Sequence, residues 1–150
     1  MNAPRQTKAE LARRTWRLMF DFLVFTAPAR EVSLQRRGLT PNDSRALFSL
    51  DRDNGRPIGS LAGQWGCDPS NVTFIIDRLE RAGLAERQPA PDDRRIKMVV
   101  LTDEGARTKT ELQNEFHIPP TELRHLSSIE LESLEKILVK LRTEAKREGS

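Results

Sequence analysis

The sequence predicts a mainly α-helical chain with one small β-hairpin, an α+β fold, and three observations support this prediction. Apolar residues recur at helical spacing over several segments of the 150 residues. These segments are bounded by residues that begin or end helices, such as Thr40 before Pro41 and Gly83 after Leu79. A single Pro-rich turn, at residues 89–91, separates two β-like runs. The core is therefore expected to consist mostly of helices.

The composition favours long amphipathic helices that a partner subunit helps to cover. Hydrophobic residues make up 37% of the chain and the mean hydropathy is −0.59, which is low for a self-sufficient core. No apolar run approaches the roughly 20 residues of a membrane span, and no signal-peptide core follows the charged N-terminus, so we expect a cytoplasmic chain. The one cysteine excludes an intrachain disulfide. Without a metal-ligand cluster, a phosphate loop or a nucleophile–base pair at usable spacing, we expect no metal, no cofactor and no enzymatic activity.

Two helices are predicted in the first third of the chain. A wide apolar stripe runs from Ala9 to Phe25, and Pro28 is expected to end or kink this helix. The second helix has a clear start, because Thr40 suits the N-cap, Pro41 suits the first helical position, and Asp43 follows the cap by three residues. Its inward-facing residues are Ala46, Leu47 and Leu50.

The next segment predicts a helix-turn-helix. A short helix with one buried face is indicated by apolar residues at helical spacing, namely Ile58, Leu61, Ala62 and Trp65. Gly66 and Cys67 form the break, Asp68 offers a capping oxygen to the second helix, and Pro69 takes its first position. The outward face of this second helix presents Ser70, Asn71, Thr73, Phe74 and Asp77.

The residues that follow predict a wing and two further helices. A strand, a Pro-rich turn and a second strand at Ile96–Leu101 form a hairpin, and a hairpin after a helix-turn-helix is a wing. Thr102 caps a helix that ends near Glu115. The last helix starts at a capping box, Ser127 to Glu130, and then carries leucines at alternating spacings of three and four. Such a seam buries little unless another helix covers it.

Three stretches between Leu39 and Gly105 share one pattern: GLTPNDSRALFSL, LAGQWGCDPSNVTFIIDRLERAGLAER and PDDRRIKMVVLTDEG. Their specific parts are D-R-L-E-x-x-G-L at residues 77–84 and D-x-R…L-T-x-x-G at residues 93–105. In this order and spacing they resemble the MarR family of bacterial winged helix-turn-helix transcriptional regulators. The resemblance implies a homodimer with a recognition helix in each major groove and a wing tip in the flanking minor groove. It implies an N-terminal dimerisation helix and connection (1–38), a DNA-binding lobe (39–105) and C-terminal dimerisation helices (106–150), intertwined as one domain.

The resemblance places the predicted DNA contacts on the second helix-turn-helix helix and on the wing. These contacts are Pro69, Ser70, Asn71, Thr73, Phe74, Arg78, Asp93, Arg94 and Arg95. The helix N-terminus supplies backbone N–H groups for a phosphate. Arg78 matches a position that resembles an anchor to the DNA backbone.

By resemblance, Arg95 is the wing residue expected to enter the minor groove, where a narrow A·T-rich segment attracts a guanidinium. Asp93 would accept hydrogen bonds that hold either this arginine or the hairpin in shape. The alternative is an exposed ion pair at the hairpin tip, worth about 0–1 kcal/mol. Asp92 has no expected role beyond keeping the tip solvated.

Phe74 departs from the family pattern, because related sequences often have a basic or polar residue at this position. Its ring could meet a thymine methyl group, which would favour an A·T pair there. It could equally pack on the wing. The sequence leaves these two alternatives open.

Further predicted sites concern the dimer and a small ligand. The dimer interface is expected at Leu11, Leu18, Leu131, Leu134, Leu138 and Leu141. By resemblance, an anionic aromatic ligand would bind in a cleft lined by Trp16, Arg17, Phe20 and Phe48, with core packing as the alternative role of these residues. The ligand would shift the spacing of the two recognition helices through its differential affinity for each spacing.

The sequence thus predicts a homodimeric repressor that binds a pseudopalindromic double-stranded DNA operator and is released by a small ligand. The rival is a winged-helix protein-interaction scaffold without specific DNA binding. The charge distribution leaves the scaffold alternative open. The whole chain has a net charge of +3, but residues 68–97, which would contact DNA, contain six basic and six acidic side chains. Cys67 is expected to be a small, semi-buried turn residue rather than an oxidant sensor. His117 and His125 lack partners at metal-ligand spacing.

Overall fold

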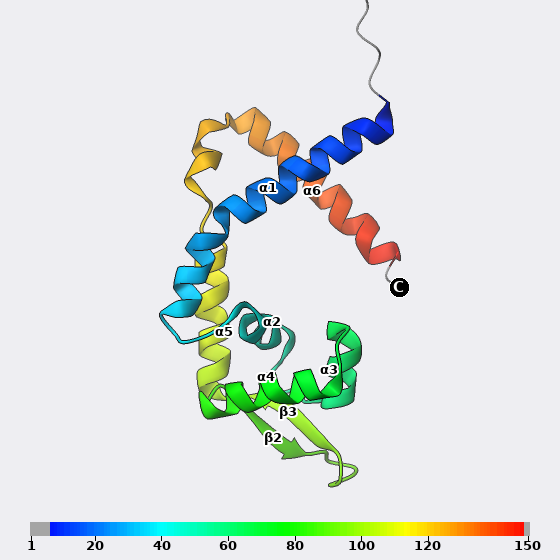
Figure 1. The fold of residues 1–150 in the computed structure, drawn as a ribbon, viewed down its shortest axis with the longest axis vertical. Helices are drawn as coiled ribbons and strands as arrows, with labels where there is room; N and C mark the ends of the chain where they lie inside the picture. The colour runs from blue at the N-terminus through cyan, green and yellow to red at the C-terminus, as the bar shows by residue number, and fades with distance from the viewer. Residues whose placement is uncertain (1–6, 149–150) are drawn as a thin grey trace, which may run out of the picture. The chain divides into compact units, whose positions relative to one another are not determined.

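The computed structural model describes residues 7–148 and divides into two units, one ending at His117 and one beginning at Ile118 (Figure 1). The first unit contains α1 (Lys8–Gln35), α2 (Pro41–Ser49), β1 (Arg56–Pro57), α3 (Ile58–Trp65), α4 (Pro69–Arg81), β2 (Ala85–Pro89), β3 (Lys97–Leu101) and α5 (Asp103–Phe116). The second contains the 3-10 helix η1 (Thr121–His125) and α6 (Ser128–Glu148). The predicted α+β fold, mainly helical with a small wing, is confirmed. The first six residues of the predicted N-terminal segment lie outside the described residues.

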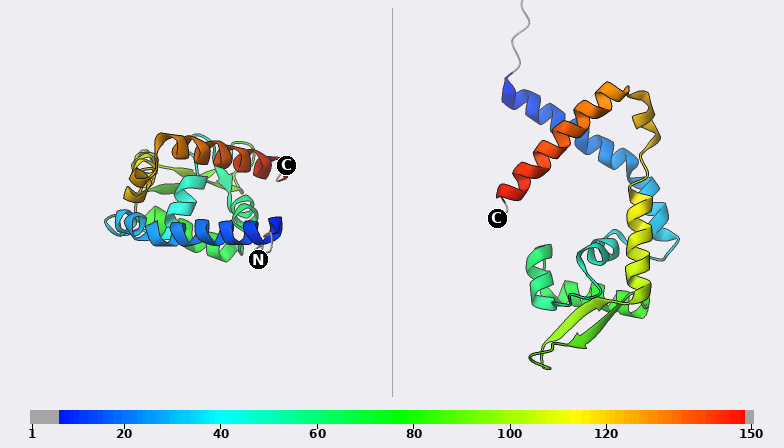
Figure 2. Two further views of the ribbon diagram at one scale, coloured as in Figure 1. Left: turned by 90° about the horizontal axis from the view of Figure 1, so that it is seen from above. Right: turned by 180° about the vertical axis from the view of Figure 1, so that it is seen from behind.

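Helix α1 does not end at Pro28 but continues to Gln35. Its axis changes direction between the N-terminal and C-terminal halves (Figures 1 and 2), so the kink is the correct alternative. Proline has no N–H to donate to the carbonyl four residues earlier. Near this interruption, the Arg30 guanidinium donates to the Leu23 carbonyl at 2.8 Å. The carbonyl that Pro28 leaves without its backbone donor is that of Val24, one residue further along the helix.

Helix starts follow the predicted capping residues, with one exception. Thr40 caps α2 by accepting from the Asp43 N–H at 3.2 Å, and the Asp43 carboxylate accepts from the Thr40 N–H at 2.8 Å. The prediction that the Asp68 side chain caps α4 is wrong, because this side chain makes no capping hydrogen bond. The Asp68 carbonyl instead accepts from the N–H of Asn71, at 3.0 Å. Pro69 occupies the first helical position as expected.

The core of the first unit lies among α2, α3 and α4, with β3 and α5 closing it. Its fully buried side chains include Leu47, Leu50, Leu61, Val72, Ile76, Leu79, Val99 and Leu112. Those that lie in helices form the inward faces that helical spacing predicts, and Val99 is contributed by β3. Because the same spacing points the intervening residues outward, burial of Val72, Ile76 and Leu79 leaves one side of α4 facing solvent.

The sheet is antiparallel with strand order β1–β3–β2. The β2–β3 hairpin is the predicted wing, although its second strand begins at Lys97 rather than Ile96. Strand β1, which comprises only Arg56 and Pro57, was not predicted and pairs with the other edge of β3. The views from the front and from behind both show the hairpin extending beyond α3 and α4 (Figures 1 and 2).

The end of α4 is tied to the start of α5. Gly83 has a φ of 72°, a left-handed conformation that ends α4, and its carbonyl accepts from the Thr102 hydroxyl at 2.6 Å. The same hydroxyl accepts from the Gly105 N–H at 3.0 Å, which caps α5. Gly105 approaches Leu84 so closely that a Cβ at this position would collide with the Leu84 carbonyl. These contacts set where the wing leaves the helices.

In the second unit, the predicted capping box starts α6. The Ser127 N–H donates to the Glu130 carboxylate at 2.8 Å, and the Glu130 N–H donates to the Ser127 hydroxyl at 3.4 Å. The seam is exposed in the single chain at Leu131, Leu134, Leu138 and Leu141. Between residues 7 and 148, no helix combines the length and apolar character that crossing a bilayer requires.

Candidate nucleic-acid interface

Helix α4 presents a mostly polar face to solvent. Ser70, Asn71 and Phe74 are exposed, with 59% of the Phe74 surface accessible. Thr73 is half-buried, and its hydroxyl donates to the Pro69 carbonyl at 3.0 Å. The predicted contact residues of this helix are therefore brought together over its first two turns.

The wing tip is exposed throughout residues 91–97. The Asp93 carboxylate accepts from the backbone N–H of Arg95 at 2.9 Å, and the Asp93 carbonyl accepts from the Ile96 N–H at 3.0 Å. Asp93 therefore shapes the hairpin and does not hold the Arg95 guanidinium. In the described chain, neither the Arg94 nor the Arg95 guanidinium has an ion-pair or hydrogen-bond partner. The alternative of an ion pair at the tip is therefore wrong.

Acidic residues of α4 are turned toward the wing rather than toward solvent alone. Arg87 of β2 pairs with Asp77 at 2.7 Å and also with Glu80. Two of the six acidic side chains in residues 68–97 are thus engaged between helix and strand. The free wing tip, residues 91–97, contains three basic and two acidic side chains. The charges of the whole segment are balanced, whereas the wing tip has one more basic than acidic side chain.

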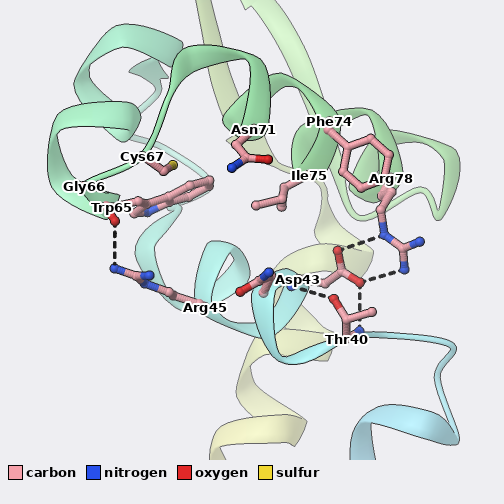
Figure 3. A pocket seen from close by; sticks show the side chains of 11 residues that line it. Thr40, Asp43, Arg45, Trp65, Gly66, Cys67, Asn71, Phe74, Ile75 and Arg78 are labelled. Carbon is pink, nitrogen blue, oxygen red and sulfur yellow. Dashed lines mark hydrogen bonds and ion pairs between the residues drawn. The ribbon is translucent and has the colours of Figure 1, made fainter.

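A groove of about 490 Å³ lies between α2 and α4, beside the α3–α4 turn (Figure 3). Its lining comes from these three places and consists of Thr40, Asn42, Asp43, Arg45, Trp65, Gly66, Cys67, Asn71, Phe74, Ile75 and Arg78. The exposed Arg45 side chain crosses to the α3 end and donates to the Trp65 carbonyl at 3.1 Å. Cys67 is half-buried against the core, as predicted for a turn residue.

Arg78 is held by Asp43 across this groove. Its Nε donates to Asp43 at 3.1 Å and one terminal nitrogen donates at 2.9 Å (Figure 3). Burial raises the pKa of Asp43, but the hydrogen bonds from Arg78 and Thr40 outweigh it and leave this pKa below its usual value. The same pairing raises the pKa of Arg78. The capping pattern in the sequence predicts Asp43 only as a helix cap, because its bond to Arg78 depends on how α2 and α4 pack.

The lobe and its site have the arrangement of a known family. A family model described as the MarR family matches residues 39–97. YhbI of Bacillus subtilis, an uncharacterized HTH-type transcriptional regulator, is 30% identical over 103 residues, 66% of this chain and 67% of YhbI. This chain belongs to the MarR family. The MarR family consists of transcriptional regulators rather than enzymes.

Two further proteins show the extent of the likeness. The HTH-type transcriptional repressor MdtR of B. subtilis is 36% identical over 73 residues, 49% of this chain and 47% of MdtR. The crystal structure of the YusO protein from B. subtilis has a TM-score of 0.72 and 26% identity, with 91% of this chain and 98% of YusO covered. The chain spans between 47% and 67% of the length of YhbI and MdtR, whereas the fold match to YusO covers nearly all of both chains.

In this MarR-family chain, an ion-pair cluster joins the end of α1 to α5. Arg37 donates to Glu115 at 2.6 Å and to Glu111 at 3.3 Å. The hydrogen bond from Arg37, followed by one from Ser33, lowers the pKa of Glu115 to about 2. The cluster fastens the helix that precedes the lobe to the helix that follows it.

The four predicted ligand residues lie in two different settings. Trp16, Arg17 and Phe20 are exposed on α1. Phe48 is half-buried, and its ring meets that of Phe116 edge-on at 5.6 Å between centroids, which is a core-packing contact. None of the four lines the groove of Figure 3.

Proposed function

We propose that this chain is a homodimeric transcriptional repressor, acting in the cytoplasm, that binds a pseudopalindromic double-stranded DNA operator. The observation that supports this proposal most is that one lobe has both an exposed polar face on α4 and an exposed wing tip. The arginines of this tip have no partner in the described chain. A recognition helix of this kind fits the major groove. Asp77 and Glu80 of α4 pair with Arg87 of β2 and not with the tip arginines.

Each predicted contact residue has a role in this proposal. Ser70, Asn71, Thr73 and Phe74 would meet base edges, while the backbone at Pro69 and the N-terminus of α4 would meet a phosphate. Arg78 would contact a phosphate from the position in which Asp43 holds it. Arg94 and Arg95 would enter the flanking minor groove, with Asp93 shaping the hairpin that carries them.

The dimer is proposed from two apolar surfaces, each considered by itself. Leu11 and Leu18 are exposed on α1, and Leu131, Leu134, Leu138 and Leu141 are exposed on α6. Apolar rows on long helices are stabilised when a second helix covers them. In this proposal, residues 1–38 and 106–150 provide the dimerisation helices and residues 39–105 the DNA-binding lobe. Two recognition helices about 34 Å apart would then match one turn of DNA.

Repression and ligand release form the finer part of the proposal. MdtR, with 36% identity over its matched segment, is named as a repressor. An anionic aromatic ligand would be held by the exposed rings of Trp16 and Phe20, the Arg17 guanidinium, and the edge of Phe48. The ligand would release DNA by binding more tightly to the dimer whose recognition helices have the wrong spacing.

A gel-shift titration with the DNA upstream of its own gene, against unrelated DNA of equal length, tests the proposal. We expect tighter binding to the upstream DNA, weakening with salt at both sequences. A footprint would then locate the operator, and loss of the chain should raise transcription from that promoter. Equal affinity for both DNAs at every salt concentration would favour the scaffold function instead.

A further inference from the structure

The first two turns of α4 contain no cationic side chain. Residues 69–77 read PSNVTFIID, so the helix that would face the bases begins without arginine or lysine. The first arginine, Arg78, has two nitrogens committed to Asp43. The next, Arg81, lies in the last turn and donates to the Asp77 carbonyl at 3.2 Å. Bidentate reading of guanine by arginine, the commonest specific contact in the major groove, therefore has no donor at the start of this helix.

Phe74 occupies the centre of this face and is not packed by the rest of the chain. It is 59% exposed and is not among the hydrophobic residues packed against the core. Within residues 7–148, Phe48 and Phe116 form the aromatic ring contact, and Phe74 has no aromatic partner. The ring lines the groove toward α2, next to Asn71 and Arg78 (Figure 3). Packing on the wing, the second alternative that the sequence left open, is therefore not how this ring is placed.

Asn71 lies one turn before Phe74 on the same side of α4. Its side-chain amide is exposed and makes no hydrogen bond within the part of the chain that the structure describes. Three residues of helix rise about 4.5 Å, about 1 Å more than the roughly 3.4 Å between base pairs, a difference that side chains of this length can span. Two side chains at this spacing can therefore address neighbouring base pairs.

We propose that α4 selects A·T pairs in the major groove, with Phe74 against the 5-methyl group of a thymine and Asn71 paired to an adenine edge. Thymine is the base that offers a methyl group in this groove, and asparagine matches the N6 donor and N7 acceptor of adenine. This inference rests on the proposed DNA-binding function. It assigns base preference to two residues and excludes an arginine–guanine contact from the first two turns.

The Phe74 contact can be tested without changing the protein. Once an operator is defined, each thymine is replaced in turn by deoxyuridine, which lacks only the 5-methyl group, and affinity is measured by fluorescence anisotropy. Loss of one buried methyl-sized group corresponds to about a fourfold weaker affinity for one half-site and about fifteenfold for both. The Phe74→Ala variant should bind the thymine operator with a comparable loss and should no longer distinguish thymine from deoxyuridine. Ile118→Ala, which removes an exposed apolar side chain elsewhere, should keep the distinction.

The Asn71 contact has a parallel test with 7-deazaadenine, which lacks the N7 acceptor. When 7-deazaadenine replaces one particular adenine of each half-site, we expect the DNA affinity of the wild type to fall about fivefold and that of Asn71→Ala to stay unchanged. The Phe74 assignment would be overturned if deoxyuridine at every position left the affinity of the wild type unchanged, or if Phe74→Ala remained as sensitive to deoxyuridine as the wild type. The corresponding results with 7-deazaadenine would overturn the Asn71 assignment. If the wild type prefers no DNA sequence at all, the proposed function itself fails, which is a different result.

Discussion

The Arg78 guanidinium binds the carboxylate of Asp43 with two hydrogen bonds, at 3.1 and 2.9 Å, across 35 positions of sequence. Asp43 is 1% exposed and also closes the capping box of α2 with Thr40, whereas the Arg78 side chain is 34% exposed. One carboxylate therefore holds the start of α2 and a side chain of the recognition helix. This pair fixes where Arg78 stands before any DNA is present.

Replacing Arg78 by alanine should destabilise the fold, because the buried Asp43 carboxylate then keeps only Thr40 as a partner. We expect a lower free energy of unfolding, although the loss should be smaller than for a fully buried pair because water reaches Arg78. Arg78→Lys, which keeps the charge but not the two-pronged geometry, should lose less. Arg81→Ala, on the same helix without an ion pair among the described residues, serves as the control. Urea unfolding at pH 7 measures all three.

The effect of Arg78→Ala should also depend on pH. The pKa of Asp43 is lowered in the folded chain, so its contribution is present above the unfolded value of 3.8 and is lost as pH falls through the folded value. The difference in stability between wild type and Arg78→Ala should therefore shrink below pH 3.8. A difference that stays constant from pH 7 to pH 3 would show that the lost ion pair is not its cause.

Replacing Arg95 by alanine should weaken DNA binding and reduce its salt dependence. One lost phosphate-equivalent contact corresponds to a decrease of about one in the slope of log affinity against log salt. Arg107→Ala makes the same change in net charge on α5, outside the wing, and should leave the slope unchanged. Anisotropy titrations at several salt concentrations provide the measurement. If the slope for Arg95→Ala equals that of the wild type, Arg95 does not bind in the minor groove.

The Arg37–Glu115 pair should make stability fall in acid. The pKa of Glu115 is lowered from 4.5 to about 2, so the pair contributes fully above 4.5 and is lost as pH falls toward 2. Glu115→Gln, which cannot ionise, should be less stable than wild type at pH 7 and should lose less stability between pH 5 and pH 2. Thermal unfolding followed by circular dichroism across this range tests the expectation. Parallel pH profiles for both proteins would contradict it.

Gly105→Ala should be strongly destabilising, by about 3 kcal/mol, because the added Cβ would collide with the Leu84 carbonyl and neither backbone can yield freely. The matched change in α3, Gly63→Ala, places its Cβ in open space and should stabilise the fold by about 0.5–1 kcal/mol. Chemical unfolding of the two variants provides the comparison. Similar effects of the two substitutions would show that the close approach at Gly105 is not needed.

A charge in the α6 seam should separate the proposed dimer. Leu138→Glu would place a carboxylate in a contact repeated in both subunits, and the dissociation constant should rise by about 100-fold or more. Ile129→Glu makes a similar change on the same helix but outside the seam and should leave the mass unchanged. Light scattering after size-exclusion chromatography distinguishes the two. If the Leu138→Glu protein remains a dimer, the dimer interface does not include this seam.

The amino-acid sequence alone determined the α-helices, most of their starting residues and the order of the winged lobe. Thr40, Gly83, Thr102 and Ser127 each act on backbone groups within a few residues, so their effect is local and visible in sequence. The buried faces of α2, α3 and α4 follow from helical spacing in the same way. Family membership followed from motifs within these elements.

Only the tertiary structure decided which charges are free and which are paired. Asp43 with Arg78, and Arg87 with Asp77 and Glu80, meet because helices and strands pack together, and nothing in the local pattern chooses these partners. The same holds for strand β1, whose two residues become a strand only by pairing with β3. Local backbone chemistry is encoded within a few residues, whereas ion pairs and edge strands depend on distances that packing sets.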